Sequence, residues 1–136
     1  MSGCWGLQNE GSARTRALLA CFGGMASVGT LTGLAALEVV TAGEGTVFCL
    51  ASLANGDPMV QQRPREAERV AAVDGCPLAC ARRIAERAGF PPPAALVLTH
   101  DPGIKKGPPP ALTEEDRERA VEAIRNALRG RDRAGE

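Results

Sequence analysis

Residues 69–81 read RVAAVDGCPLACA, and this stretch decides the fold. The apolar run Val70–Val73 predicts a short buried strand. The run stops at an Asp-Gly turn, and Pro77 suits the first position of a helix, which makes Cys76 its predicted N-cap and places Cys80 in its first turn. A strand that turns directly into a helix is the repeating unit of parallel α/β sheets.

The same alternation runs through the rest of the chain. The first predicted helix has its cap at Ser27 and ends at Ala42-Gly43, and a short polar helix is predicted over 64–69. A third helix is predicted from Pro77 to Gly89, with Leu78 on its inner face. The last helix is predicted to follow a capping box of Thr113 with Asp116. The fold class predicted is α/β, with a small parallel, Rossmann-like sheet of about four strands, helices on both faces and right-handed crossovers. The strands are predicted at Ala17–Phe22, Thr46–Leu50, Val70–Val73 and Ala94–Thr99.

Length and composition predict one modest domain. The chain has 136 residues, which suffice for one core, and we assign that domain to 16–129, with disordered tails at 1–15 and 130–136. The formal net charge is zero and aromatic residues make up 3% of the chain, so nucleic acid is not an expected partner. Five cysteines without disulfide-scaffold spacing indicate reduced thiols and a cytoplasmic location.

An uncharged stretch at 17–37 raises the question of a membrane or export segment. Residues 18–21, LLAC, resemble a lipoprotein cleavage site, but the apolar run before Cys21 is too short for a signal peptide. Glycine, serine and threonine dilute the stretch, and Glu38 ends it, which disfavours a spanning helix. We therefore expect no membrane association.

Four cysteines share one placement, which is the strongest functional feature of the sequence. Cys21, Cys49, Cys76 and Cys80 each lie at or just past the end of a short apolar run. The carboxyl ends of parallel strands lie along one edge of the sheet, so these thiols are expected to meet there. Thiolates are the ligands that zinc and other soft metals prefer, and a helix N-terminus favours the thiolate form. The alternative is that these cysteines are small buried hydrophobic residues.

Three further residues near the cysteines are candidates to support such a site. Asp74 is placed to hydrogen-bond amides beside a metal, although a carboxylate there can equally stabilise the turn. Gly75 is better suited to close backbone approach than to chemistry. His100, the single histidine, follows the fourth strand and is a candidate ligand or general base, although a lone histidine in a loop is more often solvated.

The helix that begins near Ser27 offers a place for a small anion. Main-chain amides at a helix N-terminus can hold an anion, and Lys105 and Lys106 could add positive charge. The glycine spacing at 24–29 approaches that of a phosphate-binding loop, but Thr30 stands where the lysine should follow. A nucleotide is therefore not expected, and a lysine pair is also common in solvent.

The cysteine segments together resemble the DGC-domain family, for which zinc binding has been suggested. The resemblance is carried by Cys21 with its glycines, Thr46–Ala51, Ala67–Ala81 and Gly103–Lys106, and the family is named after the triplet seen here at 74–76. It implies a small prokaryotic protein with four metal-binding cysteines, which map to Cys21, Cys49, Cys76 and Cys80. Phe22 departs from the small residue expected after the first cysteine, which makes Cys21 the least secure ligand.

Three classes of function follow from these observations. The first, which we favour, is a metal-binding protein with zinc held by four thiolates, in a structural or a metal- or thiol-handling role. The second is a thiol redox protein that uses Cys76 and Cys80, possible partners in a disulfide, with a thiol partner. The third is an enzyme with an open metal position facing Gly23-Gly24 and His100, or an iron-sulfur protein with the same ligands. Whether the chain is an enzyme, and its oligomeric state, stay open.

Overall fold

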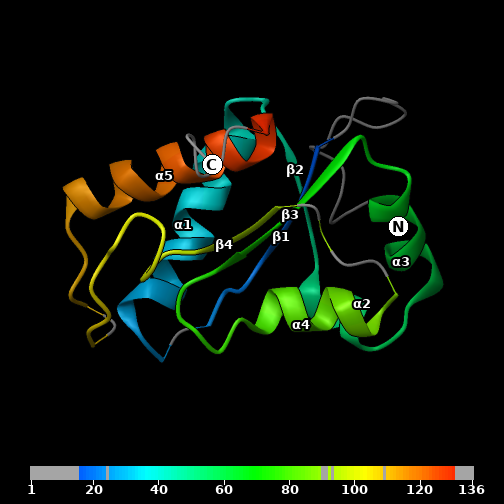
Figure 1. Ribbon diagram of the computed structural model, residues 1–136, viewed down its shortest axis with the longest axis horizontal. Helices are drawn as coiled ribbons and strands as arrows, with labels where there is room; N and C mark the ends of the chain where they lie inside the picture. The colour runs from blue at the N-terminus through cyan, green and yellow to red at the C-terminus, as the bar shows by residue number, and fades with distance from the viewer. Residues whose placement is uncertain (1–15, 24, 90–91, 93, 109, 131–136) are drawn as a thin grey trace.

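A computed structural model of the chain describes residues 16–23, 25–89, 92, 94–108 and 110–130. Within these ranges four parallel strands form one sheet in the order β2-β1-β3-β4 (Figure 1). The predicted α/β class with a small parallel sheet is confirmed. The predicted tail at 1–15 lies outside the described residues, as does the predicted tail at 130–136 except for Gly130, which is the C-cap of the last helix. The strands are β1 (Arg16–Ala20), β2 (Thr46–Phe48), β3 (Arg69–Asp74) and β4 (Ala94–Val97).

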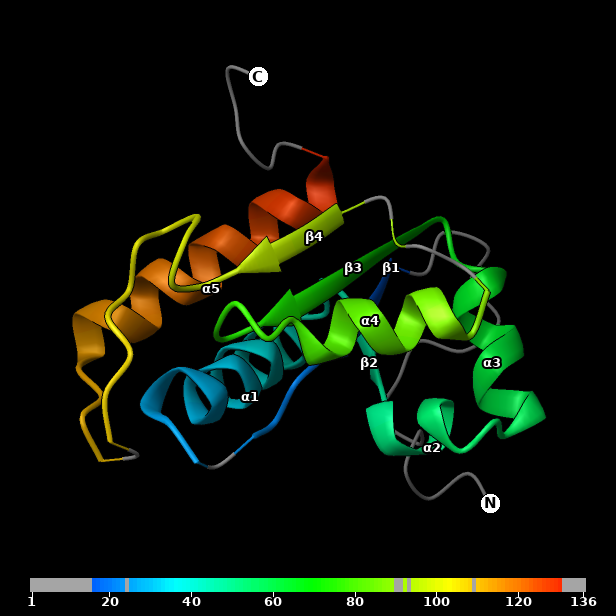
Figure 2. The same cartoon turned by 60° about the horizontal axis from the view of Figure 1, so that its bottom comes forward.

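Helices cover both faces of the sheet (Figures 1 and 2). α1 (Ser27–Thr41) and α5 (Glu114–Arg129) pack on one face, and α2 (Leu50–Ala54), α3 (Pro58–Arg65) and α4 (Cys80–Arg87) pack on the other. Side chains of β1 alternate between the two layers, because successive residues of a strand point to opposite faces. Leu18 belongs to the core under α1 and α5, whereas Leu19 belongs to the core under α2 and α4.

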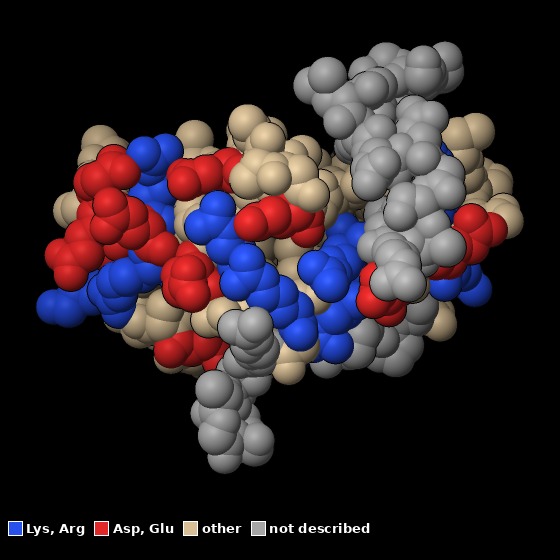
Figure 3. All heavy atoms as spheres, turned by 90° about the horizontal axis from the view of Figure 1, so that it is seen from above, with Lys and Arg blue, Asp and Glu red and all other residues tan. Residues whose placement is uncertain are grey.

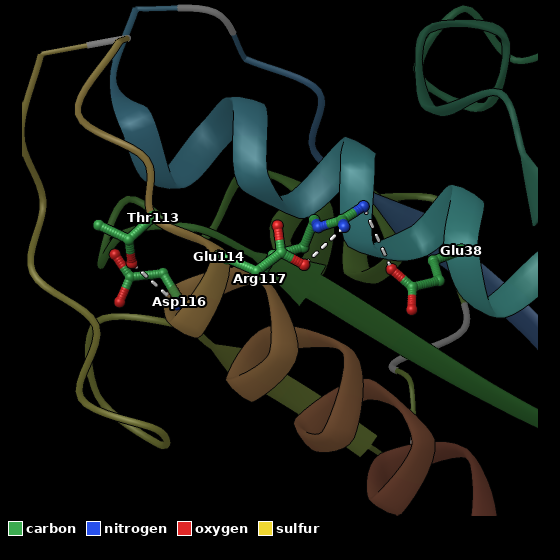
Figure 4. A network of polar contacts seen from close by, with 5 residues as sticks. All are labelled: Glu38, Thr113, Glu114, Asp116 and Arg117. Carbon is green, nitrogen blue, oxygen red and sulfur yellow. Dashed lines mark hydrogen bonds and ion pairs between the residues drawn. The ribbon is translucent and has the colours of Figure 1, made fainter.

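The long helix α5 is fixed to α1 by apolar packing and by ion pairs. Ile124 and Leu128 of α5 are buried in the core that they share with α1. In Figure 4, Arg117 reaches from α5 towards Glu38 of α1, with an N–O distance of 3.5 Å, while it pairs with Glu114 at 2.7 Å. Exposed pairs of this kind contribute little to stability, so apolar burial carries the packing.

The charged residues of this layer face outwards. On the face seen in Figure 3, Lys and Arg side chains lie among Asp and Glu side chains. Such mixing agrees with the zero net charge of the sequence. None of the helices in the described ranges is long and apolar enough to cross a membrane.

The helix starts show which local predictions hold. Thr113 caps α5, and its Oγ1 accepts a hydrogen bond from the Asp116 N–H at 3.0 Å (Figure 4), as predicted. The predicted cap at Ser27 is wrong, because Ala26 is the N-cap of α1. Ser27 instead makes a pair of hydrogen bonds with Gly107: its N–H donates to the Gly107 carbonyl at 2.9 Å, and its Oγ accepts from the Gly107 N–H at 3.0 Å.

Between β2 and β3 the chain folds differently from the prediction. β2 ends at Phe48, and the next residues form α2, which was not predicted. The predicted polar helix over 64–69 is displaced, because α3 begins at Pro58. Asp57 caps α3 by accepting hydrogen bonds from two amides of its first turn, and Pro58 is its first residue.

The helix after β3 also starts later than predicted. Ala79 adopts a left-handed conformation with φ 52°, and α4 begins at Cys80 instead of Pro77. Cys76 is therefore not the N-cap, but Cys80 is in the first turn, as predicted. Leu78 does not join the inner face of the helix, because it lies in the turn before α4 with 62% of its surface exposed.

Candidate metal centre

The candidate site lies where the strand order of the sheet reverses. β1 and β3 are neighbours in the middle of the sheet, and the chain leaves β1 towards α1 on one face and β3 towards α4 on the other. Open α/β sheets bind ligands at such a switch point, outside the carboxyl ends of the strands. The pairing continues one residue beyond the strands, since the Cys21 N–H donates to the Val73 carbonyl at 3.0 Å. The backbone of Cys21 therefore lies beside that of Asp74, where the chain turns towards α4.

Asp74 fixes the start of α4. Its carboxylate is 2% exposed, and its two oxygens accept hydrogen bonds from the N–H groups of Ala81, at 2.6 Å, and Arg82, at 3.1 Å. Ala79, the N-cap, has no side chain that could do this, so the acceptor comes from β3. Burial raises the pKa of the Asp74 carboxyl, and the two amide bonds oppose that shift. These amide bonds fit both roles considered for Asp74, support of a metal site and stabilisation of the turn.

Gly75 allows two turns of the backbone to pack against each other. A Cβ atom at this position would lie 2.6 Å from both the carbonyl carbon and the oxygen of Val28 in α1. Gly29 is equally constrained, because a Cβ atom there would overlap the Gly23 carbonyl. The requirement is close backbone approach, as the sequence analysis expected of Gly75. The turn after β3 and the turn after β1 are thereby held together.

Three of the four predicted cysteines share one cavity. Cys21, Cys76 and Cys80 line a cavity of about 300 Å³ between the two turns, with Asp74 and Gly75 at its wall. Cys21 and Cys76 are half-buried, and Cys80 is exposed. Burial raises the pKa of the Cys21 thiol, and the nearby Asp74, Cys80 and Cys76 add to that rise although a main-chain hydrogen bond from Gly23 opposes it. The thiols of Cys76 and Cys80 are therefore close enough to Cys21 for their charges to affect its pKa.

Cys49 lies apart from this group. It is exposed and caps α2, and its Sγ accepts a hydrogen bond from the Ser52 N–H at 3.5 Å. The Ser52 hydroxyl and then this amide lower the pKa of the Cys49 thiol. Leu19 and Phe48 are the last paired residues of β1 and β2. Cys49 follows Phe48, so its backbone comes next to that of Ala20. Cys49 is not among the described residues that line the cavity.

The donor set suits a soft metal ion, although the side chains have not converged on one point. Thiolates are preferred by zinc and other soft ions, and three of them face the same space. Among the residues that the structure describes, no three Cys, His, Asp or Glu side chains form a group that could already hold a metal ion. Metal binding therefore requires the cysteine side chains to move towards one another.

The loop after β4 completes the cavity with a cation. Ile104 is buried and its N–H donates to the Leu98 carbonyl at 2.9 Å, while Gly107 is tied to Ser27. These two anchors bring the loop beside the start of α1 (Figure 1), and Lys106 lines the cavity. Lys105 and His100 are exposed and are not among the described lining residues.

Two apolar residues that line the cavity were not predicted to belong to the site. Met25 and Leu78 line the cavity and are 94% and 62% exposed, so they form an open apolar rim. Leu78 was expected to be buried, and no feature of residues 77–79 indicates that the helix starts late. A left-handed Ala79 has no sequence signal, since this conformation normally favours glycine or asparagine.

The chain was compared with known protein families. The sequence model of the DGC domain matches residues 17–124, which include most of β1, the four candidate cysteines and most of α5. Neither the curated proteins nor the solved structures contain a significant match to the chain.

Proposed function

Because the chain belongs to the DGC-domain family, we propose that it binds a soft metal ion, zinc in the first instance, through the thiolates of Cys21, Cys76 and Cys80. The family implies a metal-binding role. The observation that carries the proposal for this chain is that these three thiols line one cavity at the switch point of the sheet. Cys80 has no evident packing role, since it is exposed, whereas Cys21 and Cys76 also pack against the two cores.

The surrounding residues would preorganise this site. Asp74 holds the first amides of α4, which sets where Cys80 begins the helix. Gly75 lets the turn that carries Cys76 approach α1. The hydrogen bond from the Cys21 N–H to Val73 fixes the backbone of the third ligand. A bound ion would supply charge neutralisation for the thiolates and, where a coordination position stays free, Lewis acidity.

Cys49 is the candidate for a closed, fourfold thiolate site. Its backbone lies beside β1, but its Sγ is engaged by Ser52, and it would have to leave that cap to become a ligand. A site with all four cysteines would be tetrahedral and closed, as structural zinc sites are.

Metal content under anaerobic purification tests the proposal. We expect about one zinc ion per wild-type chain by elemental mass spectrometry. Cys21→Ser, Cys76→Ser and Cys80→Ser should each lower the metal content sharply. Cys4→Ser is the control and should leave it unchanged, because this cysteine belongs to no predicted strand end. Equal metal content in the four variants, or no metal affinity in a zinc titration of the wild type, would refute the proposal.

A further inference from the structure

We infer that the metal site has a free fourth coordination position, which takes the thiolate of a small external molecule, with Lys106 as the cation that attracts it. The inference rests on the proposed function and adds the ligand class that the site would accept. It starts from an asymmetry of the cavity: three thiols from two turns line it, and the remaining cysteine of the set does not.

The local role of Cys49 argues for three protein ligands rather than four. Its Sγ already accepts a hydrogen bond at the start of α2, which satisfies an amide that would otherwise lack a partner in the helix. If Cys49 moved to the cavity, that cap would be lost. Metal sites with three protein ligands keep a position for an external ligand.

The shape of the cavity argues for a small occupant. Its volume of about 300 Å³ is at the lower end of the range for small-molecule sites. Met25 and Leu78, both largely exposed, leave its mouth accessible. The apolar lining of Val28, Met25 and Leu78 suits the carbon atoms of a small thiol.

The charge of the lining argues for a negatively charged ligand. Lys106 is the one lysine or arginine among the described residues that line the cavity, and it is held there between the buried Ile104 and the tied Gly107. Asp74 also lines the cavity, but its carboxylate is buried and accepts two amide hydrogen bonds, whereas Lys106 is exposed. An incoming thiolate would therefore meet a single cation beside the thiols.

The binding step is a ligand exchange without oxidation or reduction. The external thiol loses its proton to the solvent, a metal–sulfur bond forms, and a solvent ligand leaves. No other co-reactant is required.

Absorption spectroscopy of the Co²⁺-loaded protein under anaerobic conditions tests this inference. Co²⁺ is the probe because its absorption bands report the number of sulfur ligands. Added 3-mercaptopropionate should change the spectrum in a saturable way, and propionate at the same concentrations should not. In Cys49→Ser, where serine can still cap α2, the Co²⁺ affinity and the response to the thiol should match the wild type.

The lysine variants supply the matched control. Lys106→Met should weaken 3-mercaptopropionate binding about fivefold, as expected for an exposed charge, and added salt should narrow that difference. Lys105→Met, one residue away but outside the described cavity lining, should bind like the wild type, and Lys106→Arg should restore affinity.

Two kinds of failure are distinguishable. If Co²⁺ binds and depends on Cys21, Cys76 and Cys80, but Cys49→Ser also loses it or the thiol leaves the spectrum unchanged, the free fourth position is refuted and the proposed function stands. If the wild type does not bind Co²⁺, or if Cys21→Ser, Cys76→Ser and Cys80→Ser bind it as the wild type does, the proposed function itself fails.

Discussion

The carboxylate of Asp74, at the end of β3, accepts a 2.6 Å hydrogen bond from the main-chain N–H of Ala81, in the first turn of α4. A second bond joins Asp74 to the N–H of Arg82 at 3.1 Å. This contact links the central strand to the helix that carries Cys80. It replaces the local cap that Ala79 cannot provide. The geometry of the candidate site therefore depends on one buried carboxylate.

Removing this carboxylate should destabilise the whole domain. Asp74→Ala leaves two amides without acceptors, at least one of them buried, and should lower the free energy of unfolding by about 3 kcal/mol in urea denaturation. Asp57→Ala is the matched control, because Asp57 also accepts two amide hydrogen bonds at a helix start but is exposed. Asp57→Ala should lower the free energy of unfolding by about 1 kcal/mol. Similar losses in the two variants would contradict this account of Asp74.

The pattern of apolar residues along the sequence predicted most of the strands and helices, because each type of element has its own apolar period. The four strands fall where apolar runs occur, and Thr113 caps its helix through a local hydrogen bond. The starts of α1 and α4 could not be predicted, because residues outside these helices decide them. Ser27 is engaged by Gly107, 80 residues away, and α4 is capped from β3.

The site was predictable only in part, for a topological reason. Cys21 and Cys76 come together because β1 and β3 are adjacent, as expected for parallel strands. Cys49 follows β2, which is also a neighbour of β1, but the chain enters α2 directly after it and Ser52 engages its Sγ. Whether a thiol at a strand end faces the cavity or caps a helix depends on how the chain leaves the strand, and this information is not contained in the position of a cysteine at a strand end. The role of all four cysteines as ligands stays a prediction.

Gly75 should tolerate no side chain. A Cβ atom there would lie 2.6 Å from backbone atoms of Val28, which cannot rotate away as a side chain would. Gly75→Ala should lower the free energy of unfolding by about 2 kcal/mol or more, measured by thermal or urea denaturation. Gly23→Ala is the control, since a Cβ atom at that position would meet the Cys21 sulfur at an ordinary 3.6 Å. A loss for Gly23→Ala as large as that for Gly75→Ala would show that the close approach to Val28 is not the cause.

The hydroxyl of Ser27 should hold the lysine loop against α1. Ser27→Ala removes the acceptor for the Gly107 N–H, so local opening of the loop should become easier by about 1 kcal/mol. Trypsin should then cut after Lys105 or Lys106 about fivefold faster, a rate that mass spectrometry of a digestion time course measures. Thr30→Ala, a half-buried substitution on the same helix, should not change the rate. Equal cleavage in Ser27→Ala and the wild type would show that the main-chain hydrogen bond between residues 27 and 107, together with Ile104, is enough to fix the loop.

The opposite pKa shifts of Cys49 and Cys21 should appear in the alkylation of these two thiols. Hydrogen bonds from Ser52 lower the pKa of Cys49, whereas burial raises that of Cys21, and only the thiolate reacts. In metal-free protein, iodoacetamide should therefore modify Cys49 at lower pH than Cys21, as peptide mapping by mass spectrometry would show. Ser52→Ala removes the hydroxyl, which is the larger cause of the lowered Cys49 pKa. The midpoint of the pH dependence of alkylation should therefore move upwards for Cys49 and stay unchanged for Cys21.

The same measurement on zinc-loaded protein separates the two forms of the metal site. If the cavity holds the ion with three cysteines, zinc should protect Cys21, Cys76 and Cys80 from alkylation, while Cys49 keeps both its low midpoint and its dependence on Ser52. If zinc protects Cys49 as well, that thiol has left its cap to complete a closed site. Ser52→Ala would then bind zinc more tightly than the wild type, because no hydrogen bond from that hydroxyl would oppose the movement.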